Sequence, residues 1–338
     1  MDKKRFGTSR KLGPSIAAIG GGTGLSTMLR GLKYYSEDIT AIVTMADDGG
    51  GSGVLRHDLG MPPPGDIRNC LEALANVEPV MAELLSYRFS GGALRGQSFG
   101  NLFLAALNEM SPSFDTAVRR MSEVLAITGR VLPVTNENVN LEAEFENGTR
   151  VLGESKIFEF KKKQDCRITR VRLLPEHPKA LAESVGAIEN ADLILLGPGS
   201  LYTSIIPNLL VDGIAEAVRS SPAVKIYVCN IMTQEGETEG YTVSDHIRAI
   251  FAHSSPELFN LCLTNSKPIP YEVKALYEVE GAAPIVCDTE NCSKLGVELI
   301  SKDVANVGAN IVRHDPDALA GEIMSLYAER SNIHLFGE

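Results

Sequence analysis

Three short apolar runs along the chain end directly in clusters of glycine and small polar residues. Each run has the length of a buried strand, and apolar positions at helical spacing follow the first cluster. A strand, a glycine turn and a helix in this order are typical of parallel strands joined by crossover helices, which predicts the α/β fold class. The runs and their turns are residues 16–19 with 20–24, residues 39–43 with 46–53, and residues 193–196 with 197–200.

The same alternation of strand-like and helix-like segments resumes toward the C-terminus. It predicts a Rossmann-like, mostly parallel sheet with helices on both faces, and a last helix that begins at Asp315-Pro316. We expect one domain over residues 15–330, a flexible basic tail at residues 1–14 and a second tail at residues 331–338. Later strands are expected at residues 224–229, 258–263, 284–287 and 310–313.

Between about residues 129 and 174, short β-type runs replace this alternation. The Asn147-Gly148 pair between two of the runs is a hairpin signal. We therefore expect an antiparallel β insert on the main sheet rather than an independent domain. Its runs are residues 130–134, 139–143, 149–152 and 168–173.

The glycine turns predict a phosphate-binding site. Glycine has no Cβ to keep a phosphate from the backbone, and a helix that begins just beyond adds unpaired N–H groups. In an open α/β sheet such turns lie at the carboxyl ends of the strands, where they can surround one crevice. We expect a nucleotide or another phosphate ester to contact Gly21, Gly22, Thr23, Gly24, Gly197, Gly199, Ser200 and Leu201.

The first turn departs from the common phosphate signatures. A dinucleotide fingerprint counted from Gly20 needs a glycine where the chain has Leu25, and no Gly-Lys-Ser/Thr follows as in a P-loop. This disfavours a nicotinamide oxidoreductase. The alternative to phosphate contact is a tight strand-to-helix turn, but four glycines in five positions exceed what a turn requires.

Three aspartates are candidate metal ligands. Asp47 and Asp48 follow the second strand, and Asp66 lies near a helix start. Asp47 and Asp48 could hold a divalent cation such as magnesium, or they could accept hydrogen bonds from ligand hydroxyls. The alternatives are turn formation for Asp47 and Asp48 and helix capping for Asp66, and the sequence does not decide between these roles and ligand binding.

Further polar residues stand at the ends of later strands. Asn230, with Thr233 and Gln234 in the loop after it, could contact a base or a sugar, although an asparagine also suits a turn. Arg313 is a candidate phosphate clamp because its planar guanidinium suits bidentate contact. The alternative for Arg313 is a surface ion pair with Asp315 or Asp317.

Composition narrows the function classes. A net charge of −11 argues against a general nucleic-acid binder, and no apolar run is long enough for membrane insertion. The six cysteines form no Cys-x-x-Cys pair, which favours buried thiols in a cytoplasmic protein. The oligomeric state stays open, a homodimer included.

Taken together and in order, these segments resemble the gluconeogenesis factor family, the bacterial branch of the CofD-like proteins, over about residues 16–327. The resemblance implies a Rossmann-like fold, binding of uridine-diphosphate (UDP) sugars, and roles in growth on gluconeogenic carbon sources and in cell shape and wall synthesis. It rests on residues 20–24, 46–53, 62–69, 197–204, 228–234 and 313–315.

Archaeal and actinobacterial relatives in the wider family imply an alternative function for this chain. They are transferases that join a phospholactyl group from a guanosine-linked donor to a deazaflavin acceptor with magnesium, and their aspartates match Asp47, Asp48 and Asp66. Residues 49–53 and 62–66 follow the gluconeogenesis factor pattern instead. We therefore expect a nucleotide-sugar-binding regulator, with the phospholactate-type transferase as the alternative and the question of catalysis open.

Overall fold

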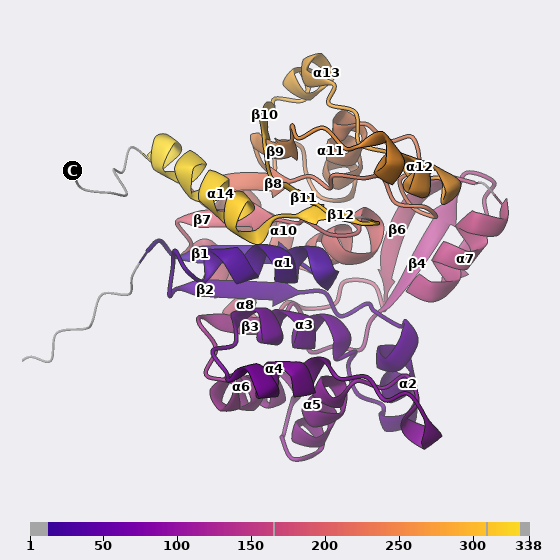
Figure 1. Cartoon of the computed structure of the whole chain (residues 1–338), viewed down its shortest axis with the longest axis vertical. Helices are drawn as coiled ribbons and strands as arrows, with labels where there is room; N and C mark the ends of the chain where they lie inside the picture. The colour runs from indigo at the N-terminus through magenta and orange to yellow at the C-terminus, as the bar shows by residue number, and fades with distance from the viewer. Residues whose placement is uncertain (1–12, 165, 309, 332–338) are drawn as a thin grey trace, which may run out of the picture.

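A sheet of seven parallel strands forms the centre of the structure (Figure 1). The computed structural model describes residues 13–164, 166–308 and 310–331. The strand order is β10-β9-β8-β7-β1-β2-β3, and every pairing is parallel, which confirms the α/β class. The strands are β1 (Ile16–Gly20), β2 (Ile39–Val43), β3 (Arg130–Pro133), β7 (Leu193–Leu196), β8 (Val224–Val228), β9 (Leu261–Asn265) and β10 (Glu298–Lys302).

Helices cover both faces of this sheet, which explains why β1, β2 and β7 are buried along their whole length. In Figure 1 the neighbours α14, α1 and α3 lie in front of the sheet, and α8, which contacts β2 and β3, lies behind it. The helices of the main domain are α1 (Gly22–Leu32), α2 (Gly50–Leu59), α3 (Gly65–Leu74), α4 (Pro79–Ser86), α5 (Phe99–Glu109), α6 (Phe114–Val124), α8 (Ala182–Glu189), α9 (Ile206–Leu209), α10 (Ile214–Ser220), α11 (Val243–His253), α12 (Tyr271–Val279), α13 (Thr289–Lys294) and α14 (Pro316–Ser331), with a 3-10 turn η1 (Gly92–Leu94) and a π-helical turn η2 (Leu201–Ile205).

A three-stranded antiparallel sheet forms the insert, as expected, in the order β5-β4-β6. Residues 130–134, however, were wrongly assigned to it: they supply β3, which pairs with β2 at the edge of the main sheet. The insert also contains a helix that the β-type pattern did not indicate. Its elements are β4 (Asn140–Phe145), β5 (Arg150–Leu152), α7 (Glu154–Gln164) and β6 (Ile168–Leu174).

Two of the later strand assignments were also wrong. Residues 284–287 form only isolated bridges, and Val286 is 62% exposed, so this apolar run is not a buried strand. The strand next to β9 is instead β10. The segment expected at residues 310–313 forms β12 (Val312–His314), which pairs antiparallel with β11 (Ala305–Val307) in a separate two-stranded ribbon.

The main hydrophobic core lies around the central sheet, and a second, smaller cluster lies beneath the β11–β12 ribbon. Its buried members are Ile231, Met232, Ile269, Val273, Ala305 and Val312.

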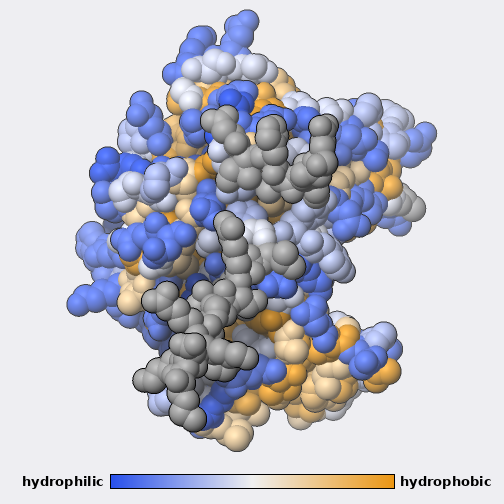
Figure 2. Space-filling view, turned by 90° about the vertical axis from the view of Figure 1, so that its left-hand side faces the viewer, coloured by the Kyte–Doolittle hydropathy of each residue, from blue (hydrophilic) through white to orange (hydrophobic). Residues whose placement is uncertain are grey.

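Figure 2 shows the side of the molecule that faces left in Figure 1. Most of this surface is hydrophilic, and hydrophobic residues gather low on it, in the part that α4, α5 and α6 form in Figure 1. No helix within the described ranges is long and apolar enough to cross a membrane. The expected tails fall almost wholly on residues 1–12 and 332–338, which lie outside the described residues.

Candidate functional site

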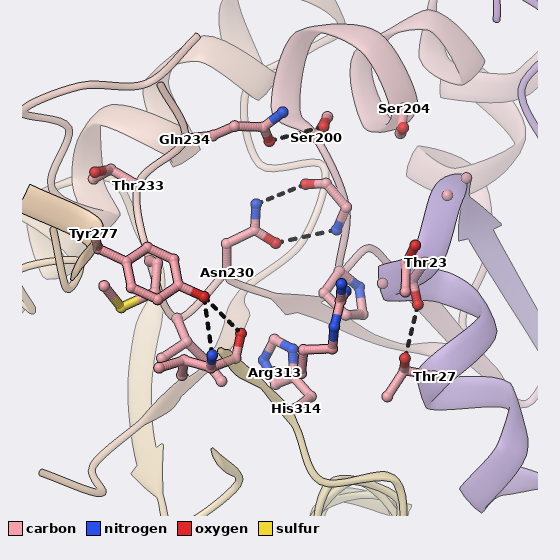
Figure 3. A pocket seen from close by; sticks show the side chains of 18 residues that line it. Thr23, Thr27, Ser200, Ser204, Asn230, Thr233, Gln234, Tyr277, Arg313 and His314 are labelled. Carbon is pink, nitrogen blue, oxygen red and sulfur yellow. Dashed lines mark hydrogen bonds between the residues drawn. The ribbon is translucent and has the colours of Figure 1, made fainter. Parts of the chain in front are cut away.

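A cavity of about 360 Å³ lies at the carboxyl edge of the sheet, between the first and third glycine turns, the loop after β8 and the β11–β12 ribbon (Figure 3). This volume lies within the usual range of small-molecule sites. The structure brings most of the expected ligand residues to its wall: Gly21, Gly22, Thr23, Gly24, Gly199, Ser200, Asn230, Thr233, Gln234 and Arg313. Gly197, Leu201 and Asp48 do not line it, and the Leu201 side chain lies in the core.

The first glycine turn presents the N-terminus of α1 to this cavity. Gly21 is the N-cap residue, and no side chain caps the helix through a hydrogen bond at that position. The first-turn N–H groups have no acceptor within the helix, and the helix dipole adds positive potential there. The carboxylate of Asp66 accepts a hydrogen bond from the backbone of Gly22, which leaves the amides of Thr23 and Gly24 as the candidates for an anionic ligand.

Close contact between the first and third turns explains the glycine at position 24. A Cβ on Gly24 would lie 2.5 Å from the carbonyl oxygen of Pro198, which is backbone and cannot rotate away. Gly22, two residues earlier, has φ +65°, in the left-handed region that favours glycine. The two turns therefore form one continuous backbone wall.

The third turn is held by amide side chains from the loop after β8. Asn230 Oδ1 accepts from the Gly199 N–H at 3.1 Å, and Asn230 Nδ2 donates to the Gly199 carbonyl at 2.8 Å (Figure 3). The Ser200 hydroxyl donates to Gln234 Oε1 at 2.8 Å. Both amide side chains thus fix the shape of the turn.

The start of η2 is capped by an acidic side chain that sequence reasoning missed. Glu237 Oε1 accepts from the backbone N–H groups of Tyr202 at 2.7 Å and Thr203 at 3.2 Å. The sequence predicted that amides at this helix start would be available to a phosphate, but the Glu237 carboxylate already accepts from them. The N-terminus of α1 is therefore the stronger anion site. The only sequence signal for Glu237 was its place in a polar loop after a strand.

Arg313 stands on the ribbon side of the cavity, across from Thr23 and Thr27 of α1 (Figure 3). Within the described ranges its guanidinium has no hydrogen-bond or ion-pair partner, and Asp315 instead accepts from the N–H groups of Asp317 and Ala318. Burial lowers the pKa of the adjacent His314 to about 4, so that imidazole is neutral near pH 7. The placement of Arg313 was expected, although its strand belongs to the ribbon and not to the main sheet.

Each of the three candidate metal ligands has a backbone partner of its own. Asp47 Oδ1 accepts from the Gly49 N–H at 2.8 Å, Asp48 Oδ1 accepts from the Ser155 N–H at 2.8 Å, and Asp66 accepts from Gly22. In the described part of the chain, no group of three or more His, Cys, Asp and Glu side chains is arranged to hold a metal ion. Each aspartate therefore helps to hold the backbone, and a magnesium ion at these positions stays a prediction of the transferase alternative.

A second cavity of about 440 Å³ lies next to the first and shares Gln234 with it. Asp47, Glu154 and Glu237 are among its lining residues. Burial raises the pKa of Glu154 to about 9 and that of Glu237 to about 7. Burial and the charge of Asp47 raise the pKa of nearby Asp66 to about 7. Carboxyl groups with these pKa values can retain protons near neutral pH, so they can donate as well as accept hydrogen bonds.

Comparison with known proteins gives consistent matches over most of the chain. A family model described as 2-phospho-L-lactate transferase CofD matches residues 16–305. The chain is 54% identical over 314 residues to the "Putative gluconeogenesis factor" of Thermoanaerobacterium thermosulfurigenes, covering 93% of this chain and 97% of that protein. It is 49% identical over 317 residues to the "Gluconeogenesis factor" of Bacillus subtilis, covering 94% and 99%. A crystal structure of a upf0052 family member from Bacillus halodurans has a TM-score of 0.88 at 46% identity, covering 92% and 99%.

Proposed function

Since the chain belongs to the 2-phospho-L-lactate transferase CofD family, among its gluconeogenesis factors, we propose that it binds a nucleotide sugar as a regulatory ligand. The ligand is a UDP sugar, and it occupies the 360 Å³ cavity between the first glycine turn and Arg313. Its phosphates lie against the N-terminus of α1. When the UDP sugar is bound, the protein signals the supply of envelope precursors in the cytoplasm.

The observation that carries this proposal is the guanidinium of Arg313, which has no partner within the described residues and lines a cavity that also contains the N-terminus of α1, where the amides of Thr23 and Gly24 have no acceptor within the helix. A lone cation and unpaired N–H groups on the same cavity are the two usual means of binding a phosphate. The polar side chains of the loop after β8 add hydroxyl and amide groups, which suit a sugar.

The cellular role that we propose is regulation of carbon flux, with effects on growth on gluconeogenic carbon sources and on cell shape and wall synthesis. It is supported by the gluconeogenesis factor names of the relatives. Among the described residues that line the cavity, none pairs a nucleophile with a base, so binding accounts for the geometry without a reaction.

The ligand is tested by thermal shift and calorimetry with UDP-N-acetylglucosamine, UDP-glucose and NAD. Binding to the native state alone raises the melting temperature by mass action. We expect the two UDP sugars to raise it more than NAD does at equal concentration. An equal or larger shift with NAD would exclude the proposed ligand class.

The transferase alternative keeps one observation in its favour, the raised pKa of Glu154, which lines the second cavity, and of Asp66, which accepts from Gly22 in the wall of the first, because such carboxyls suit proton transfer. It predicts that guanosine diphosphate binds more tightly with magnesium than with a chelator, and that Asp48→Asn abolishes the difference. Binding isotherms that overlay under both conditions would show that magnesium takes no part in nucleotide binding.

A further inference from the structure

A separate cavity of about 380 Å³ lies between the insert strand β6 and the helix α11. Its walls come from the start of β6, from η2, from α11 and from the turn before α11. Among the described residues, it shares none with the two cavities of the candidate site. Its volume lies within the usual range of small-molecule sites.

Two arginines on this wall have unused hydrogen-bond donors. The hydrogen bonds of Arg167 are made by its backbone, with Glu146, and within the described ranges its guanidinium has no partner. Arg248 donates to Asp245 Oδ1 at 2.6 Å and makes no other hydrogen bond through its side chain in the same ranges. A guanidinium has five N–H donors, so most of those of Arg248 are also unused. Two arginines and one aspartate leave the wall with a net positive charge, in a chain with a net charge of −11.

A pair of tyrosine hydroxyls adds one more unused donor. The hydroxyl oxygens of Tyr202 and Tyr241 lie 2.9 Å apart and share one hydrogen bond. Burial raises the pKa of both phenols, so both hydroxyls keep their hydrogens near pH 7. One of these two hydrogens lies in the shared bond, and the other has no acceptor among the described residues.

The carboxylate and the imidazole on the wall, by contrast, are already bonded. Asp245 Oδ2 accepts from the Thr242 N–H at 2.9 Å in the capping box of α11. His253 Nε2 accepts from the Val171 N–H at 3.0 Å, while Nδ1 donates to the Ala249 carbonyl at 2.7 Å. Burial lowers the pKa of His253, which keeps this imidazole neutral near pH 7. The wall therefore has an excess of donors, and a ligand that complements it must supply acceptors.

We propose that this cavity binds an oxyanion, the carboxylate or phosphate group of a small metabolite. Arg167 is the main contact, because a free guanidinium binds either group through two parallel hydrogen bonds. The free hydroxyl hydrogen of the tyrosine pair and the unused N–H groups of Arg248 supply further donors.

The anion would be a second ligand, distinct from the nucleotide sugar. The two sites are adjacent through η2, which contributes Tyr202 to this cavity and Ser204 to the 360 Å³ cavity. The inference does not depend on the proposed function, since the cavities have no wall residue in common.

Binding is tested in the Arg313→Ala variant, so that the guanidinium of the first cavity does not contribute. The probes are sodium succinate and sodium phosphate, compared with sodium chloride at constant ionic strength. We expect succinate or phosphate to raise the melting temperature above its value in chloride, because binding stabilises the native state. A rise with succinate alone identifies a carboxylate ligand, and a rise with phosphate alone identifies a phosphate ester.

Variants of the wall locate the bound anion. Arg167→Ala, added to Arg313→Ala, should weaken the probe roughly 10-fold or more, because a charge-assisted hydrogen bond is lost. Tyr202→Phe together with Tyr241→Phe removes both hydroxyls and leaves neither without its partner. We expect this pair of substitutions to weaken the probe roughly 3- to 10-fold.

Position 170 provides the matched control. Arg170 is exposed, lies on the same strand β6 and does not line the cavity. Arg170→Ala in the same background removes the same charge from the same strand and should leave the affinity for the probe unchanged. The melting temperature of each variant without a probe separates loss of a contact from loss of the fold.

The outcomes distinguish this inference from the proposed function. Equal affinities in the Arg167→Ala and Arg170→Ala variants, or no stabilisation by either probe beyond that of chloride, would overturn the anion site. With Arg313 intact, Arg167→Ala should keep the wild-type affinity for UDP-N-acetylglucosamine. A protein that binds the UDP sugar but neither probe would leave the proposed function standing without this inference. Binding of a probe that depends on Arg167, in a protein that binds no UDP sugar, would do the reverse.

Discussion

At the scale of single residues, the charge of Arg313 has no counter-charge within the described part of the chain, whereas the charge of Arg68 is paired with Glu72. Arg68, at a helix start where a cation is unfavourable, donates to Glu72 at 2.7 Å and to Asn101 at 2.9 Å. Residue type and position alone could not separate the two cases. The separation depends on which side chains the fold brings nearby.

Arg313→Ala should weaken UDP-sugar binding roughly 10- to 100-fold, because a charge-assisted hydrogen bond to an anion is lost. The melting temperature of the free protein should not change, since the guanidinium has no partner to lose among the described residues. Calorimetry and a thermal melt check the two statements. Arg219→Ala, which removes an exposed arginine paired with Glu216, is the control. Wild-type affinity in Arg313→Ala would place the phosphates elsewhere.

Glu237 should make stability depend on pH. The side chain is 5% exposed, and burial raises its pKa to about 7 from an ordinary value of 4.5. The folded protein therefore keeps a proton that the unfolded chain releases at lower pH, so the free energy of unfolding falls as pH rises from about 4.5 through 7.

Glu237→Gln should remove this dependence, because glutamine can still accept from the Tyr202 and Thr203 amides without becoming charged. We expect the variant to exceed the wild type in stability at pH 8 by about 1–3 kcal/mol and to match it near pH 5. Urea unfolding at the two pH values measures the difference. A constant difference across pH would mean that Glu237 is ionised in the folded protein.

At the scale of elements, the sequence predicted best where a strand is buried on both faces. β1, β2 and β7 are apolar runs buried along their whole length; β1 and β7 lead directly into their glycine turns, and β2 ends three residues before its own. The pattern failed for β3, for residues 284–287 and for α7. Strand partners and exposure decide these segments, and neither can be obtained from one segment alone. The convergence of the turns was predictable, because parallel strands all end at one edge.

The contact between α1 and the third turn predicts the effect of a single methyl group. Gly24→Ala should destabilise the protein by about 1–3 kcal/mol, since its Cβ would meet the Pro198 carbonyl and push the two turns apart. It should also weaken UDP-sugar binding. Gly186→Ala in α8 is the matched control, because nothing lies within 4 Å of its added Cβ. Thermal melts and calorimetry on both variants test this contact, and equal stability of the two would refute it.

At the scale of the whole molecule, the candidate site is assembled from segments far apart in the chain. The glycine turns and Arg313 could be named from the sequence because their chemistry is visible in the residue types. Tyr277 and Glu154 could not, because α12 and the insert helix α7 reach the cavities only through the tertiary fold. Helical spacing gives no information about which strand edge a helix will face.

The insert is attached to the main domain in part through Asp48, whose carboxylate accepts from the Ser155 N–H at the start of α7. Lys162 adds an ion pair to Glu235 at 3.1 Å. Asp48→Ala should therefore speed hydrogen exchange in α7 while exchange in β1 and β7 stays unchanged. Hydrogen exchange read by mass spectrometry localises the effect. Unchanged protection of α7 would show that other contacts hold the insert in place.

The wall formed by the first and third turns is mostly backbone, and this has a genetic consequence. Apart from Pro198, every position of this wall has a backbone N–H group whatever its side chain, so random mutation rarely deletes these groups and mostly displaces them. A screen for alleles that fail to bind the ligand should therefore recover substitutions at Gly22 and Gly24 more often than at the neighbouring threonines. Ligand binding then depends on the path of the chain through these two turns as much as on the side chains that face the cavity, such as Arg313.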